Sequence, residues 1–248
     1  MKRKPASAVR QYKKAFPQFP AGLNQYHSYV KPTAKLPKAP PSLETYNKIK
    51  RWPLDGNAYY GDCTMAAAAH AIHLWNVITH ESNPVPLTSD VVREYRKFAK
   101  TPQAGLIEAN VLKTWHRGGL WGHRILGYTP INVHDIAMIK QAAYLYGLVY
   151  VGVQLTKSAE KQYKQRKPWA LVRDWKNEVP VGGHAIPIVG YDRDGFYVVT
   201  WGVVQKMTFE WWHTYGEEAW AIFPQQLKEA GGADHLNLAQ LRADLKLL

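Results

Sequence analysis

Any nucleophilic chemistry of this sequence starts from Cys63, the only cysteine in 248 residues. It follows Gly61-Asp62 and precedes the alanine run Ala66–Ala69, which predicts that the thiol stands at the start of a helix. Unpaired backbone N–H groups and the helix dipole stabilise a thiolate there, and the thiolate is the nucleophile. A buried structural cysteine is the alternative, because free cysteines are often buried.

A histidine far along the chain, His184, supplies the base that such a thiol needs. It stands in Gly183-His184-Ala185, and an apolar run follows through Val189-Gly190-Tyr191. A turn at Arg193-Asp194-Gly195 and a second apolar run predict a β-hairpin that ends at Trp201-Gly202. A Cys63–His184 pair would form a covalent acyl intermediate, with the imidazole as base and then as acid. A hydrogen-bonded core histidine is the alternative.

The order of these pieces resembles the papain-like cysteine peptidase family, in its short, disulfide-free bacterial or phage form, over about residues 52–223. The matching pieces are Asn57-x-x-x-Gly61-Asp62-Cys63, Gly183-His184-Ala185 and Trp201-Gly202. The resemblance implies an oxyanion site made by the Cys63 backbone N–H and the amide of Asn57, which stands where the family has glutamine. It also implies that Trp201 shields the pair from water. A turn residue and a core tryptophan are the respective alternatives.

One position departs from the family pattern. The family has an asparagine two residues before this tryptophan, which orients the histidine, and here that position is Val199. Valine cannot accept a hydrogen bond, and strand alternation is expected to point Thr200 to the opposite face from Val199 and Trp201. The register is therefore shifted, or another group orients His184, or the protein uses a dyad, or it is not a peptidase.

The elements that must position these residues predict an α+β protein with a papain-like architecture. A helical half built on the central helix that bears Cys63 would pack against an antiparallel β half that carries His184. The sequence pattern predicts helices over about 63–80, 89–100, 107–117, 133–146, 208–215 and 234–248, and strands over 121–128, 148–155 and 218–223. Residues 156–180 are expected to form a long polar loop.

Positive charge is concentrated at the N-terminus. The net charge is +13, and residues 1–51 hold twelve Lys or Arg against one acid, Glu44. Seven prolines in residues 1–42 predict an extended arm, which leads into a papain-like domain over 43–225 and a C-terminal helical segment over 226–248. The arm could be a weakly ordered tail, a pro-segment, a packing arm, or a contact for a nucleic acid or protein partner.

The composition also bears on disulfides, metal sites, cofactors and cellular location. A single cysteine excludes an internal disulfide, and His70 and His73 lack a second ligand cluster, so we expect no metal and no cofactor. No stretch of the sequence is long and apolar enough to span a membrane. The basic residues at the N-terminus are not followed by the apolar stretch that a signal peptide has. We expect a cytoplasmic protein of a bacterial or phage-infected cell, or one associated with a virion.

The resulting prediction is a thiol hydrolase, a cysteine peptidase or isopeptidase, that acts on a peptide or protein substrate through an acyl-enzyme at Cys63. The alternative is a catalytically degenerate papain-like scaffold that binds nucleic acid or serves as a virion or structural interaction protein. Val199 and the basic arm motivate this alternative. A third interpretation keeps the scaffold and changes the reaction to acyl transfer onto an amine.

Overall fold

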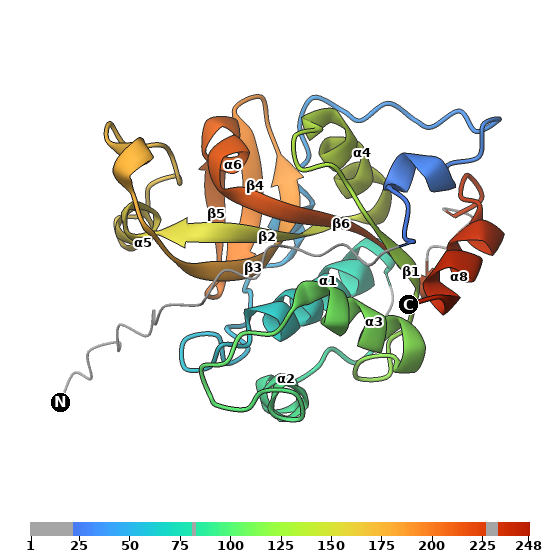
Figure 1. Ribbon diagram of the computed structural model, residues 1–248, viewed down its shortest axis with the longest axis horizontal. Coiled ribbons are helices and arrows are strands. Elements are labelled where there is room, and N and C mark those ends of the chain that lie inside the picture. The colour runs from blue at the N-terminus through green and yellow to red at the C-terminus, as the bar shows by residue number, and fades with distance from the viewer. Residues whose placement is uncertain (1–21, 81–82, 227–232) are drawn as a thin grey trace.

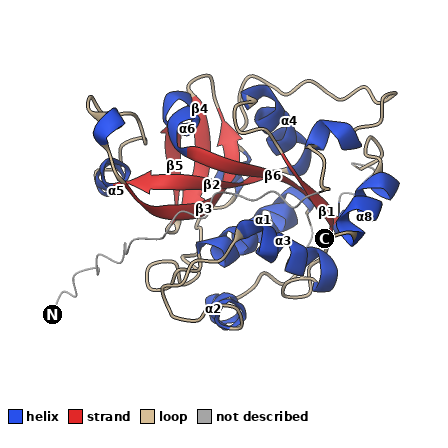
Figure 2. Cartoon of the chain, viewed as in Figure 1, coloured by secondary structure: helices blue, strands red, loops and turns tan. Residues whose placement is uncertain are grey.

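The computed structural model describes residues 22–80, 83–226 and 233–248. A group of helices packs on one side of a single twisted sheet, and further helices cover the other side and the two ends (Figure 1). Figure 2, which is coloured by secondary structure, shows the helical half, α1 to α3, below the strands of the β half. The predicted α+β architecture is confirmed.

The helical half is built on α1, which spans Cys63–Thr79. Nearly every residue from Thr64 to Asn76 is buried, because the alanines leave room for close packing and the larger side chains contact protein on all sides. The helix ends at His80, which adopts a left-handed conformation with φ 56°. Helices α2 (Thr88–Arg96) and α3 (Glu108–Gly118) pack against α1.

The β half is one antiparallel sheet of six strands in the order β1-β6-β2-β3-β4-β5. The strands are β1 (Ile125–Pro130), β2 (Val149–Thr156), β3 (Pro180–Tyr191), β4 (Gly195–Thr200), β5 (Val203–Thr208) and β6 (Gly216–Pro224). α1 packs on β3, whereas α4 (Ile136–Tyr146) and α6 (Phe209–Tyr215) pack above the sheet in Figure 1.

One segment differs from its prediction. The expected loop over 156–180 contains a helix, α5 (Lys157–Lys164), and a short 3₁₀ turn, η3 (Trp175–Asn177). Thr156 caps α5 by accepting a hydrogen bond from the Ala159 N–H. Trp169 is fully buried beside Met207, so this segment covers the sheet instead of extending into solvent.

The described part of the N-terminal region, residues 22–51, is packed on the body of the protein. Short 3₁₀ helices occur at η1 (Tyr26–Tyr29) and η2 (Thr45–Lys48). Tyr29 is buried, and its hydroxyl donates a hydrogen bond to Asp244 of α8 (Leu238–Lys246) at 2.8 Å. Residues 1–21 of the predicted arm lie outside the described residues, and the division into arm, domain and C-terminal segment stays a prediction.

No helix within residues 22–80, 83–226 and 233–248 is both long and apolar enough to cross a membrane.

Candidate active site

The start of α1 and the strand β3 meet at the sulfur of Cys63. The backbone N–H groups of Ala185 and Thr64 lie against the sulfur and favour its thiolate form. Because Ala185 directly follows His184, the packing of α1 on β3 brings the predicted nucleophile beside the chain segment that carries the predicted base. The local sequence explains both ends of this contact, since the alanine run forms the helix and the apolar run forms the strand.

The loop before Cys63 is held against the loop before α3. Gly61 donates its N–H to the carbonyl of Pro102 at 2.9 Å, and a Cβ at Gly61 would lie 2.7 Å from the carbonyl oxygen of Gln103. The hydroxyl of the buried Tyr95 hydrogen-bonds to three carbonyls of residues 101–104. Glycine is therefore required two residues before the cysteine because backbone, and not a side chain, occupies the neighbouring space.

The imidazole of His184 has a hydrogen-bond partner and packs against an aromatic ring. Its Nε2 lies 2.8 Å from Oγ1 of Thr200, in a hydrogen bond that is buried. The Trp201 ring stacks on the imidazole with centroids 4.8 Å apart and an interplanar angle of 17°. The threonine fixes the rotation of the imidazole, and the indole covers one of its faces.

This arrangement corrects the expectation that Trp201 points away from Thr200. Trp201 does not continue the strand, because it and Gly202 have φ values of 45° and 77°. Positive φ at both central residues is typical of a type I′ turn, here between β4 and β5. The alternation argument therefore fails at Trp201, and Thr200 and Trp201 both contact His184. Val199 is buried in the core and pairs with Val204.

Asn57, the predicted oxyanion donor, is tied to the residue before the nucleophile. Its Nδ2 donates to Oδ1 of Asp62 at 3.2 Å. Asp62 is fully buried, and its other oxygen has no hydrogen-bond partner among the described residues. Burial raises the pKa of Asp62 to about 7. Asp62 therefore holds the Asn57 side chain close to the start of α1, while the oxyanion role itself stays a prediction.

The electrostatic environment favours an uncharged thiol and an uncharged imidazole. Cys63 is partly exposed, but the surrounding protein desolvates its sulfur and, together with the charges of Glu108 and Asp62, raises the pKa of the thiol to about 12. Burial lowers the pKa of His184 to about 4. Near neutral pH the imidazole is therefore free to accept a proton.

Two residues near the sulfur had no sequence signal. Tyr150 of β2 donates its hydroxyl to the carbonyl of Thr64 at 2.9 Å, which fixes the first turn of α1 on the sheet. Glu108, the first residue of α3, is buried, and burial together with the charges of Glu218 and Glu217 raises its pKa well above its usual range. Only the convergence of α1, α3 and β2 brings them together, so no local pattern could have identified them.

The two histidines of α1 make packing contacts. The Nε2 of His70 lies 2.8 Å from the carbonyl oxygen of Pro53, and the His70 and His73 rings both lie near Trp52. Among the described residues, no three His, Cys, Asp or Glu side chains are grouped as metal ligands would be.

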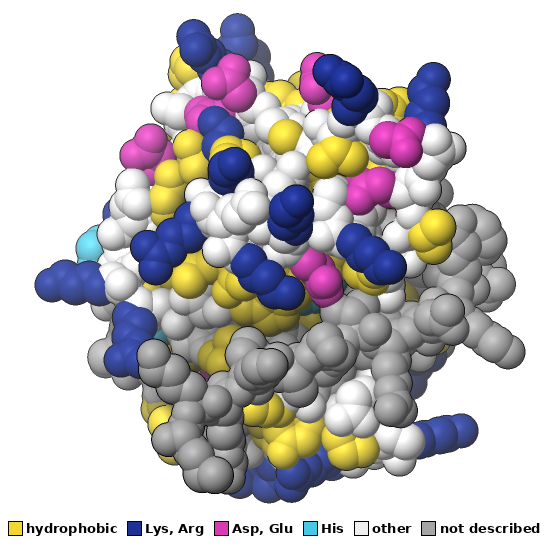
Figure 3. All heavy atoms as spheres, turned by 90° about the vertical axis from the view of Figure 1, so that its left-hand side faces the viewer, with side chains coloured by type: hydrophobic (Ala, Val, Ile, Leu, Met, Phe, Trp, Pro, Cys, Tyr) yellow, Lys and Arg dark blue, Asp and Glu magenta, His cyan; other side chains and the backbone are white. Residues whose placement is uncertain are grey.

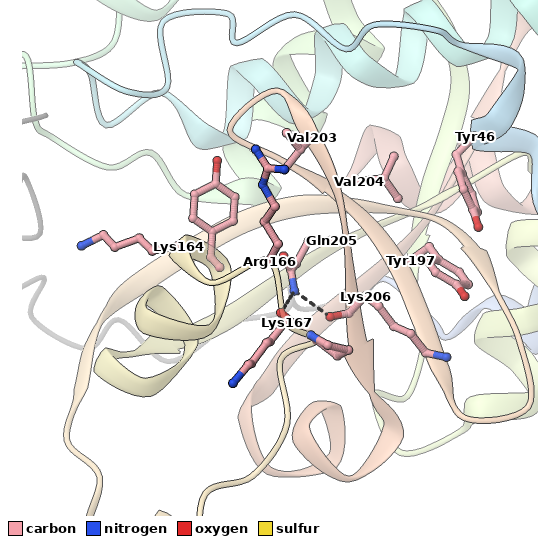
Figure 4. Close-up of a pocket in the computed structure, with 11 residues that line it drawn as sticks. Tyr46, Lys164, Arg166, Lys167, Tyr197, Val203, Val204, Gln205 and Lys206 are labelled. Carbon is pink, nitrogen blue, oxygen red and sulfur yellow. Dashed lines mark hydrogen bonds between the residues drawn. The ribbon is translucent and has the colours of Figure 1, made fainter.

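Beside β5 lies a pocket of about 620 Å³ with a basic rim (Figure 4). Lys164, Arg166 and Lys167, from the end of α5, stand on one side, and Tyr46 and Tyr197 stand on the other. The Gln205 amide donates to the carbonyls of Lys167 and Lys206 at 2.7 and 3.0 Å. Lys and Arg also outnumber Asp and Glu on the molecular face shown in Figure 3.

Comparison with known proteins identifies the fold. No protein-family model matches the chain, and no curated protein sequence matches it. Xylellain, a cysteine protease from Xylella fastidiosa, matches with a TM-score of 0.61 and 16% identity, over 86% of this chain and 99% of its own. Digestive procathepsin L 3 of Tenebrio molitor matches with a TM-score of 0.54 and 13% identity, over 87% and 76%.

A third structure is the cysteine protease CMS1MS2 of Carica candamarcensis in complex with E-64. It matches with a TM-score of 0.51 and 13% identity, over 75% of this chain and 98% of its own. The predicted papain-like fold is therefore confirmed.

Proposed function

From this fold and the surroundings of Cys63 we propose that the protein is a papain-like cysteine peptidase or isopeptidase, with Cys63 as nucleophile and His184 as base and acid. The observation that carries the proposal is the hydrogen bond between His184 Nε2 and Thr200 Oγ1, beneath the Trp201 ring, on a strand that contacts the Cys63 sulfur through Ala185. A buried core histidine would also need a hydrogen-bond partner, so the proposal depends on the place of this histidine and its aromatic cover beside the thiol.

The reaction begins with proton transfer from the Cys63 thiol to His184 as the sulfur attacks the substrate carbonyl carbon. The carbonyl oxygen takes up the negative charge, and the Cys63 backbone N–H and the Asn57 amide donate hydrogen bonds to it. The carbon–nitrogen bond then breaks, His184 gives its proton to the leaving amine, and a thioester remains. Water attacks the thioester, His184 accepts its proton, and the proton returns to the departing sulfur.

Thr200 serves as the positioning residue in this scheme. When its hydroxyl accepts the hydrogen bond from Nε2–H, the other imidazole nitrogen, Nδ1, is left unprotonated for the thiol. The hydroxyl can also donate to an unprotonated Nε2, so it fixes the position of the ring in either tautomer and supports the basic tautomer when it accepts. A carboxylate, which only accepts, would force the proton onto Nε2, and a hydroxyl also stabilises the imidazolium less than a charged partner does.

Alkylation of Cys63 by iodoacetamide at a series of pH values, followed by intact-mass measurement, tests the proposal. With His184 as the base, alkylation is already fast below the pH at which an ordinary thiol titrates, and it stays fast at neutral pH. In His184→Ala the thiol has no base and burial raises its pKa, so the rate rises only at alkaline pH and the neutral rate falls by roughly 100-fold or more.

The matched control is His213→Ala, which removes an exposed imidazole from α6. A profile with the midpoint of an ordinary thiol, unchanged by His184→Ala, would contradict the proposed pair and favour a structural cysteine.

A second candidate function, polyanion binding, is favoured by the basic pocket. Lys206 pairs with Asp192, but Lys164, Arg166 and Lys167 have no acidic partner among the described residues. Binding of a labelled single-stranded oligonucleotide should then weaken with salt and with neutralisation of these three side chains. Neutralisation of Arg117, Arg242 and Lys246, which are exposed elsewhere, is the control for net charge. If both variants lose the same binding affinity, the oligonucleotide does not bind specifically at this pocket.

A further inference from the structure

Two carboxylates from distant parts of the chain converge on one glycine beside the candidate nucleophile. A Cβ placed on Gly152 of β2 would lie 2.6 Å from Oε1 of Glu108 and 3.1 Å from Oε1 of Glu218. Glu108 starts α3 and Glu218 lies in β6, so neither is a sequence neighbour of the other. The missing side chain at Gly152 gives both carboxylates their space.

The register of the sheet places this pair next to Cys63. Gly152 pairs with Glu218 on one side and with Ala185 on the other, and the Ala185 backbone contacts the Cys63 sulfur. Tyr150 lies two residues earlier on the same face of β2, and its hydroxyl contacts the first turn of α1. The face that carries Gly152 and Glu218 is thus the face directed toward the start of α1.

Glu108 is only 5% exposed, and its Oε2 has no hydrogen-bond partner among the described residues. Burial, and then the charge of Glu218, raises the pKa of Glu108, so its charged form is costly as long as no cation accompanies it. A cation placed between the two side chains would offset both penalties. This excess of negative charge is confined to the two glutamates and their surroundings, because the protein as a whole carries a net charge of +13.

The two acids differ in ways that suit a bound side chain. Glu218 is partly exposed, and its Oε2 accepts a hydrogen bond from Trp220 Nε1 at 2.8 Å, which leaves Oε1 directed at Gly152. Ile107, which precedes Glu108, is 56% exposed and offers apolar surface at the same end of α3. A long aliphatic stem with a positive head, as in arginine or lysine, matches this combination of apolar entry and acidic end.

We infer that Glu108 and Glu218 form an acidic subsite that selects an arginine or lysine side chain of a peptide bound across Cys63. This inference rests on the proposed function in its reference to a substrate, and it names the class of side chain that the substrate presents. Glu218 meets the cation from the solvent side and Glu108 meets it from the buried side, and the absence of a side chain at Gly152 lets the two carboxyl groups approach each other.

Binding of fluorescein-labelled tetrapeptides to the Cys63→Ala protein, followed by fluorescence anisotropy, tests the subsite without any need for catalysis. Arginine is moved through each position, and each peptide is compared with its citrulline twin, which has nearly the same shape but no charge. We expect one position at which arginine binds roughly 10- to 100-fold more tightly than citrulline. Glu108→Gln and Glu218→Gln should each reduce this ratio, whereas Glu210→Gln, at an exposed glutamate of α6, should leave it unchanged.

Ratios near one at every position in the Cys63→Ala protein would overturn the inference, and this result does not depend on whether the Gln variants fold. A preference for arginine that persists equally in Glu108→Gln and Glu218→Gln would also overturn it. A different result would contradict the proposed function, namely a pH profile of an ordinary thiol in the alkylation of wild-type Cys63. A charge-selective subsite beside an unreactive thiol would therefore be recognised as a binding site only.

Discussion

The imidazole of His184 is held by the hydroxyl of Thr200, with Nε2 and Oγ1 2.8 Å apart. His184 lies in β3 and Thr200 at the end of the neighbouring strand β4, and the Trp201 ring covers the imidazole from the adjoining turn. A hydroxyl thus occupies the role for which the family resemblance predicted a side-chain amide. The presence of Val199 at the family position does not by itself leave the histidine without an orienting partner.

If the protein hydrolyses peptides as proposed, replacement of Thr200 by valine should lower kcat/KM by roughly 10- to 100-fold, because the imidazolium loses a hydrogen-bond acceptor and the ring loses its fixed position. Thr200→Ser keeps the hydroxyl and should retain most of the activity. The pH–rate profile of Thr200→Val should also change, since the free Nε2 no longer has a fixed partner. Equal activity of both variants, with one unchanged profile, would show that Thr200 does not position His184.

Asn57→Ala should lower the rate of amide hydrolysis by roughly 100- to 1000-fold if the amide stabilises the oxyanion. Alkylation by iodoacetamide forms no oxyanion, so its rate at Cys63 should stay close to that of the wild type. The two measurements on one variant separate a catalytic donor from a structural one. A parallel loss of both rates would assign Asn57 to holding Asp62 and the loop instead.

Asp62 should make the protein less stable as the pH rises. Its pKa is about 7 in the folded protein and 3.8 in the unfolded chain, because burial disfavours the charged form. Its stabilising contribution is therefore present below about pH 4 and is lost as the pH rises through about 7. Asp62→Asn cannot ionise and should be more stable than the wild type at pH 8, by a few kcal/mol at about 1.4 kcal/mol per pKa unit.

Urea unfolding of both proteins between pH 4 and pH 8 measures this difference. The side chain introduced by Asp62→Asn retains an oxygen that can accept the hydrogen bond from Asn57, so the two proteins should be alike at pH 4. A difference in unfolding free energy that is the same at every pH would rule out ionisation of Asp62 as its cause.

Gly61→Ala should destabilise the protein by about 1–3 kcal/mol, because the new Cβ would lie 2.7 Å from the carbonyl oxygen of Gln103 and 2.9 Å from that of Ala104. Gly118→Ala, at the end of α3, is the control, since its Cβ would meet no atom within 4 Å. Helix propensity predicts that this control is neutral or slightly stabilising. Thermal unfolding of the two variants provides the comparison, and equal midpoints would contradict the steric explanation.

The sequence by itself determined the main elements and the order of the candidate catalytic residues. The alanine run after Cys63 predicts the buried helix α1, and the apolar runs on either side of Arg193-Asp194-Gly195 predict the hairpin of β3 and β4. These features depend on local propensity and periodicity, which neighbouring residues encode. The segment 156–180 was misjudged because its polar residues hide the short amphipathic helix α5.

Tertiary structure alone decided which side chains meet. The joint contact of Thr200 and Trp201 with His184 depends on the left-handed backbone of Trp201, which ends the strand alternation one residue earlier than the sequence pattern indicates. The convergence of Glu108 and Glu218 on Gly152 depends on the register of β2 with β6 and on the docking of α3. Long-range pairing of this kind is set by packing over the whole domain, so residues more than a hundred positions apart acquire a common role without any local signal.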